Sequence, residues 1–177
     1  MKLIRNNKTW TRNQSKSGLP WECEQETLDF LYSFVRLIKP KKIFEIGTFE
    51  GDSAIAMANA LKKNDEGGEL YTVDIKDYGQ FERLRGYINI HSLLGHNKTY
   101  PDDFDMVFID DGHTYIDVTR DLLLADNLIG KSGYILGHDP ISTKTVFYAY
   151  TDFIKRKGYE HMVLDSYAGI FIIKKSA

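Results

Sequence analysis

Five apolar runs in this chain are each followed by residues that could do chemistry. These residues are Glu45, Asp74, Gly95-His96, Asp110 and His138-Asp139. Carboxylates and imidazoles can hold a divalent cation, take a proton from a hydroxyl group, or accept hydrogen bonds from sugar hydroxyls. If the apolar runs are parallel strands, their carboxyl ends meet at the edge of the sheet where ligands bind in α/β proteins. We therefore expect one reactive rim supplied by five segments.

A glycine-containing turn follows the first of these runs, Ile43 to Ile46. Gly47 and Gly51 separate this run from a helical stripe of apolar residues that starts at Ala54. Glycine lets a small molecule approach the main chain, and the free N–H groups of a helix start can bind a carboxylate. The pattern E-x-G-x-x-x-G lacks the third glycine of the dinucleotide-binding G-x-G-x-x-G turn. It indicates a cofactor loop, with a tight turn that binds nothing as the alternative.

Composition limits the classes of function. A chain of 177 residues with 42% hydrophobic residues is long enough for one domain with a substantial core. A net charge of −2 and a pI near 6.2 give no broad positive field for nucleic acid. Cys23 is the only cysteine, which excludes an internal disulfide, and no signal peptide or membrane span is recognisable. We expect a cytoplasmic protein with an N-terminal arm at 1–23 and one domain at 24–177.

Hydrophobic periodicity predicts strands that alternate with helices. Strands are expected at 43–46, 70–75, 87–94, 104–110, 133–139, 161–164 and 170–174. Helical stripes begin at Leu28, Ala54, Tyr115 and Val146, and a short helical piece lies near 81–84. This order is typical of an α/β, Rossmann-like, three-layer sandwich of about seven strands, mostly parallel with an antiparallel terminal strand.

With these residues in place, the chain resembles the class I S-adenosylmethionine-dependent methyltransferases over about residues 24–177. It is most similar to the branch that contains macrocin-type sugar O-methyltransferases, and catechol O-methyltransferase-like enzymes are more distant. Residues 45–51, E-I-G-T-F-E-G, are similar to the first motif of that superfamily. Residues 108–115, F-I-D-D-G-H-T-Y, with the later His138-Asp139 pair, are similar to the signature of the branch.

The resemblance implies a role for each of these residues. Asp74 would bind the ribose hydroxyls, and Gly95-His96 would contact the adenine. Asp110, His138 and Asp139 would hold a divalent metal, magnesium or manganese, and His113 would act as the base beside Asp110. The full set implied for S-adenosylmethionine is Glu45, Gly47, Thr48, Phe49, Gly51, Ser53, Asp74, Ile75, Gly95, His96, Asp110 and Asp111.

The residues themselves leave other interpretations open. His113 follows a glycine and could help to cap the helix that Thr114 begins. Asp110 and Asp111 could be solvated loop acids. The imidazole of His138 suits zinc, iron, manganese or nickel better than magnesium.

The chain also departs from the superfamily. Between the third and fourth expected strands only residues 97–103 intervene, too few for the usual helix, so the adenine pocket is expected to be open. No cap insertion is visible, which leaves the acceptor site to the N-terminal arm, the loop after Asp139, or a partner subunit.

The expected function is methyl transfer from S-adenosylmethionine to the hydroxyl of a small molecule, a sugar or a phenol, with or without help from a metal. A nicotinamide-dependent oxidoreductase is one alternative, since Asp74 would serve the ribose of NAD equally well. A non-catalytic cofactor-binding subunit is the other. We expect no nucleic-acid or membrane partner, and self-association is left open.

Overall fold

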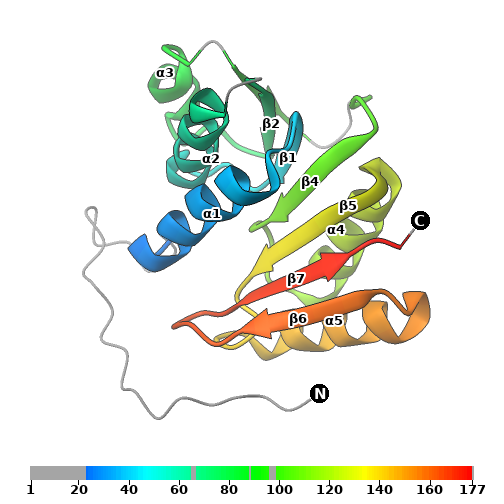
Figure 1. Cartoon of the computed structure of the whole chain (residues 1–177). Coiled ribbons are helices and arrows are strands. Elements are labelled where there is room, and N and C mark those ends of the chain that lie inside the picture. The colour runs from blue at the N-terminus through cyan, green and yellow to red at the C-terminus, as the bar shows by residue number, and fades with distance from the viewer. Residues whose placement is uncertain (1–22, 65–66, 88, 96–98, 177) are drawn as a thin grey trace.

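The computed structural model describes residues 23–64, 67–87, 89–95 and 99–176. Helices and strands mostly alternate along this part of the chain (Figure 1). The helices are α1 (Gln25–Ile38), α2 (Asp52–Lys63), α3 (Gln80–Leu84), α4 (Tyr115–Leu128) and α5 (Lys144–Lys157). The strands are β1 (Lys42–Ile46), β2 (Glu69–Asp74), β3 (Ile90–Leu94), β4 (Phe104–Ile109), β5 (Ile129–His138), β6 (Glu160–Leu164) and β7 (Ile170–Lys174). The predicted N-terminal arm at 1–23 lies outside the described residues except for Cys23.

The strands form one seven-stranded sheet in the order β3-β2-β1-β4-β5-β7-β6. β1, β2, β3, β4 and β5 pair in parallel, whereas β7 runs antiparallel to both of its neighbours. The chain order reverses between β1 and β4, and in α/β sheets ligands bind beyond the carboxyl ends of the strands at such a point. The predicted Rossmann-like architecture with an antiparallel terminal strand is confirmed.

Helices cover both faces of the sheet. α1 and α2 pack on one face, and α4 and α5 pack on the other, as Figure 1 shows. Neighbouring residues of β1 therefore enter different cores: Ile43 packs with α1 and α2, and Phe44 packs on the opposite side. Both side chains are fully buried, as expected for a parallel strand covered on both faces. Both faces of the sheet are therefore covered, and the polar residues lie at its carboxyl edge.

Two predicted strand starts differ from the structure by more than one residue. β3 begins at Ile90, because the amide of Tyr87 donates to the carbonyl of Leu84 and ends α3 in a turn. β5 begins at Ile129, directly after α4, because Ile129 already pairs with Phe104 before a register shift. The connection from β3 to β4 is short as expected, and its described residues, Gly95 and 99–103, include no helix.

Candidate cofactor and catalytic site

The turn between β1 and α2 is built from residues with positive φ. Gly47 and Gly51 have φ of +97° and +88°, and Phe49 between them has φ of +45°. A Cβ atom at position 47 would lie 2.1 Å from the carbonyl oxygen of Asp110. The main chain that follows β4 fills the position of a side chain at residue 47, and the predicted contact of Gly47 with a cofactor stays a prediction. Gly47 is required by the fold itself, whatever the turn binds.

Glu45 lies beneath this turn and not on the open rim. Its side chain is fully buried and accepts hydrogen bonds from Ser53 Oγ at 2.6 Å and Thr72 Oγ1 at 2.5 Å. Thr48 Oγ1 in turn lies 2.6 Å from Thr72 Oγ1. Burial raises the pKa of Glu45 to about 8, although both hydrogen bonds act in the opposite direction. Glu45 therefore joins β1, β2 and the start of α2, and its contact with a cofactor stays a prediction.

Asp74 ends β2 next to the turn and ties the two together. Its Oδ2 accepts from the amide of Phe49 at 2.8 Å, and its Oδ1 accepts from the amide of Lys76 at 3.1 Å. The residue is 4% exposed, whereas the next one, Ile75, is 65% exposed. Each carboxylate oxygen keeps a second lone pair, so Asp74 can still accept hydrogen bonds from two hydroxyls. Ile75 offers an apolar surface beside it.

Gly95 follows β3 at the same edge of the sheet. Its amide donates to the carbonyl of Asp74 at 2.7 Å, and it has φ of +83° with open space where a side chain would stand. Tyr100 Oη donates to the carbonyl of Gly95 at 3.2 Å. The backbone at Gly95 is therefore fixed and accessible. His96, predicted to contact a cofactor, lies outside the described residues.

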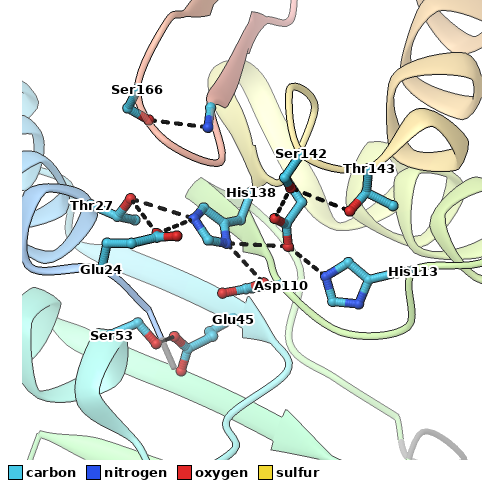
Figure 2. A network of polar contacts seen from close by, with 12 residues as sticks. Glu24, Thr27, Glu45, Ser53, Asp110, His113, His138, Ser142, Thr143 and Ser166 are labelled. Atoms are coloured by element: carbon cyan, nitrogen blue, oxygen red, sulfur yellow. Dashed lines mark hydrogen bonds and ion pairs between the residues drawn. The ribbon is translucent and has the colours of Figure 1, made fainter. Parts of the chain in front are cut away.

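His138, at the end of β5, is surrounded by acids (Figure 2). Its Nε2 lies 2.8 Å from Glu24 Oε2, and its Nδ1 lies 3.3 Å from Asp110 Oδ1 and 3.5 Å from Asp139 Oδ2. Burial lowers the pKa of His138, but the neighbouring carboxylates, Asp110 first, outweigh it and raise this pKa well above its usual range. Thr27 Oγ1 lies 3.4 Å from the same Nε2.

His113 lies beside His138 in Figure 2 and contacts the same oxygen of Asp139 that faces His138. Its Nε2 is 2.6 Å from Asp139 Oδ2, and its side chain is 44% exposed. The hydrogen bond with Asp139 raises the pKa of His113. Burial acts to raise the pKa of Asp139, but hydrogen bonds from His113 and His138 outweigh it and hold this pKa far below its usual range. Ser142 Oγ donates to the other oxygen of Asp139.

The capping alternative for His113 finds no support in the contacts. The residue that caps α4 is Thr114, whose side chain accepts from the amide of Asp117 at 3.2 Å. The imidazole of His113 instead meets Asp139, which comes from a different strand end. The turn at Asp111 and Gly112 thus brings His113 back toward the rim. Asp111 itself is half-buried on this turn.

The predicted catalytic and metal residues converge. Among the described residues, Asp110, His113 and Asp139 bring ligand atoms within 4.8 Å of one another. His138 also contacts both acids, but its second nitrogen faces Glu24 and not the open rim. The predicted metal set of Asp110, His138 and Asp139 stays a prediction. The geometry also places His113 beside Asp110 and Asp139, where it could serve as the nitrogen ligand of a metal.

A small cavity of about 30 Å³ lies between the glycine turn and Asp110. Its lining residues are Cys23, Gly47, Thr48, Phe49, Asp52, Ser53 and Asp110. The sequence alone did not place Cys23, Glu24 and Thr27 near this site. Glu24 in particular precedes a helical stripe, and an acid at such a position is usually a helix start. A larger hollow of about 700 Å³, lined by Lys39, Asp105 and Lys131 among others, contains none of the predicted site residues.

Comparison with protein families agrees with this geometry. A family model described as "Methyltransferase domain" matches residues 44–140, which is more than half of the chain. A second model, described as "O-methyltransferase", matches residues 3–84. A search of curated proteins found no match. The matched ranges include the glycine turn, Asp74, Asp110, His113 and the His138-Asp139 pair.

Solved structures share the fold at low sequence identity. An SAH-bound methyltransferase, PaMTH1 of Podospora anserina, is 18% identical with a TM-score of 0.76, and the match covers 91% of this chain and 84% of that one. TomG of Streptomyces achromogenes, an O-methyltransferase of tomaymycin synthesis in complex with SAM, is 20% identical with a TM-score of 0.71, and the match covers 90% of this chain and 84% of that one. An O-methyltransferase of Bacillus cereus in complex with SAH is 19% identical with a TM-score of 0.71, and the match covers 89% of this chain and 84% of that one. At this identity the likeness establishes the fold alone.

Proposed function

We propose that this chain, which belongs to the methyltransferase domain family, methylates a hydroxyl group of a small molecule with S-adenosylmethionine as the methyl donor. The match of residues 3–84 to the O-methyltransferase model supports oxygen as the acceptor atom. A sugar or a phenol carries such a hydroxyl. No helix in the described ranges combines the length and the apolar character needed to cross a membrane.

The observation that carries the proposal is the position of the His113–Asp139 pair. The pair lies on the rim together with Asp110, whose carbonyl touches the glycine turn at Gly47. A cofactor held by the glycine turn and by Asp74 would therefore have a base on the acceptor side. Bound S-adenosylmethionine supplies a methyl group on a positively charged sulfur.

His113 has the geometry of a general base. In one tautomer its Nε2–H group donates a hydrogen bond to Asp139 Oδ2 at 2.6 Å, which leaves Nδ1 free to accept a proton. Nδ1 would take the proton that the acceptor hydroxyl loses when it is methylated. Asp139 orients the imidazole and stabilises the imidazolium that forms. General bases of this kind contribute about 10²–10⁴-fold in rate.

A divalent ion is the second way to activate the hydroxyl. Two carboxylates and an imidazole within 4.8 Å are a fitting donor set for manganese, and the carboxylates suit magnesium. Asp110 and Asp139 would hold the ion, with His113 or His138 as the nitrogen donor, and the ion would lower the pKa of the acceptor hydroxyl. His113 cannot be a ligand and the base at once. Loss of activity in chelator, restored by magnesium or manganese, would favour the metal.

Calorimetry tests the cofactor assignment directly. We expect S-adenosylhomocysteine to bind and NAD not to bind, with or without added magnesium. Methyl transfer from labelled S-adenosylmethionine to a panel of sugars, phenols and amines then tests the acceptor. Tight binding of NAD without binding of S-adenosylhomocysteine would refute the proposed activity, and transfer only to amines would refute the hydroxyl acceptor.

A further inference from the structure

A second group of metal-ligating side chains lies next to the proposed catalytic rim. It consists of Cys23 and Glu24, just before α1, and His138 at the end of β5. One ligand atom from each lies within 4.8 Å of the other two. Figure 2 shows Glu24 on the side of His138 that faces away from Asp110 and His113. The three residues come from two segments more than 100 positions apart in the chain.

We propose that Cys23, Glu24 and His138 form a transition-metal site, with zinc as the ion that fits it best, distinct from the carboxylate rim. Zinc accepts sulfur, imidazole and carboxylate ligands together, whereas magnesium and calcium take oxygen ligands. Thiolate and carboxylate bring two negative charges, which match a divalent ion. These three ligands leave the fourth coordination position of a tetrahedral zinc ion open.

The spacing suits such an ion after a small adjustment. Ligand atoms 2.0–2.3 Å from a tetrahedral zinc lie about 3.3–3.8 Å from one another. Glu24 Oε2 and His138 Nε2 are 2.8 Å apart and would need to separate by about half an ångström. The side chains are 12% and 6% exposed, so the site is screened from water. Cys23 is half-buried.

The surroundings of His138 supply the outer partners that zinc-bound histidines require. Its Nδ1 faces Asp110 Oδ1 at 3.3 Å and Asp139 Oδ2 at 3.5 Å, leaving Nε2 for the ion. A ligating imidazole usually donates its other N–H group to a carboxylate, which fixes its tautomer. Thr27 Oγ1, 3.4 Å from Glu24 Oε2, can orient the carboxylate in the same way.

Binding of a divalent ion would leave the net charge of this group unchanged, because the ion replaces two protons. Three carboxylates, Glu24, Asp110 and Asp139, surround His138, and Asp139 also pairs with His113. When the ion binds, Cys23 loses its thiol proton and Nε2 of His138 carries none, and the displaced protons go to solvent. Because Cys23 also lines the small cavity beside Gly47 and Asp110, the ion would fasten the start of α1 to the cavity wall.

Cobalt substitution tests the site without any assay of activity. Cys23 is the only cysteine of the chain, so a thiolate-to-cobalt charge-transfer band at one equivalent of Co²⁺ can arise only from Cys23. We expect metal-free protein titrated with Co²⁺ to show this band and a tetrahedral visible spectrum. Zinc should displace the cobalt and raise the melting temperature.

Variants locate the other ligands. Cys23→Ser should abolish the band while its circular dichroism stays that of the wild type. Glu24→Gln and His138→Gln should each weaken Co²⁺ binding by at least about tenfold. His113→Ala, which changes only the carboxylate rim, is the matched control and should keep the band.

No charge-transfer band in the wild-type protein at saturating Co²⁺ would overturn the site. A band that survives unchanged in both Glu24→Gln and His138→Gln would overturn the ligand set. Because the wild-type spectrum decides the first point, misfolding of a variant cannot hide the answer. Neither result depends on whether S-adenosylhomocysteine binds.

Discussion

Replacing Glu45 by Gln should remove much of the pH dependence of the protein's stability. Glu45 is fully buried, and its pKa is about 8 in the folded protein against an ordinary value of 4.5. Below pH 4.5 the carboxyl group is protonated in both states. Between pH 4.5 and about 8 the unfolded chain loses the proton first, so the free energy of unfolding falls by about 1.4 kcal/mol per pH unit.

The loss of unfolding free energy levels off above pH 8 at about 5 kcal/mol. This is a large share of the roughly 5–15 kcal/mol of unfolding free energy typical of a domain. Gln has nearly the same shape and no charge, and the hydroxyls of Ser53 and Thr72 can reorient to pair with its amide. Urea unfolding of wild type and Glu45→Gln from pH 5 to 9 should therefore give curves that diverge as pH rises, with the variant more stable at pH 9.

Glu26→Gln is the matched control, because it makes the same chemical change at an exposed position of α1. Its curve should run parallel to that of the wild type. If the curve of Glu45→Gln is also parallel to the wild type, Glu45 is charged in the folded protein at all these pH values. The reasoning from burial would then be refuted.

Three further predictions concern single residues of the site. Gly47→Ala should destabilise the fold by at least about 2 kcal/mol with or without cofactor, because the new Cβ would meet a main-chain oxygen at 2.1 Å. Gly79 has a similar φ and open space around it, so Gly79→Ala should lower the free energy of unfolding by less in the same urea titration. Asp74→Asn, which keeps the shape of the side chain, should weaken S-adenosylhomocysteine binding by at least about tenfold in calorimetry, and an unchanged dissociation constant would show that the carboxylate serves only the turn. His113→Ala should lower kcat by about 10²–10⁴-fold at a nearly unchanged melting temperature, whereas Thr114→Ala should lower the stability by about 1 kcal/mol and leave kcat near normal. The wild-type rate should rise with pH through a pKa above 6.5, because the imidazole of His113 must lose its proton to act as the base. Near-normal kcat in His113→Ala would remove this residue from the mechanism.

The sequence by itself determined the order and type of the elements. The stripe from Leu28 to Ile38 has helical spacing and ends before Pro40, and the structure has α1 there. Apolar runs bounded by glycines and acids became strands within a few residues of their predicted limits. These features are local, because periodicity and turn chemistry depend on residues close in the chain. The rule that parallel strands end at one edge then brought Asp110 and Asp139 together correctly.

Only the tertiary structure decided which polar residues face each other and which are buried. Glu45 lies one residue before the end of β1 and Asp74 lies at the end of β2, yet Ser53 and Thr72 enclose Glu45. Gly47 is a glycine because the chain after β4 crosses it, a contact between positions 63 residues apart. The approach of Cys23 and Glu24 to His138 likewise depends on how α1 docks against the sheet. Such contacts depend on register and packing between distant segments, and the local pattern of the sequence carries no record of them.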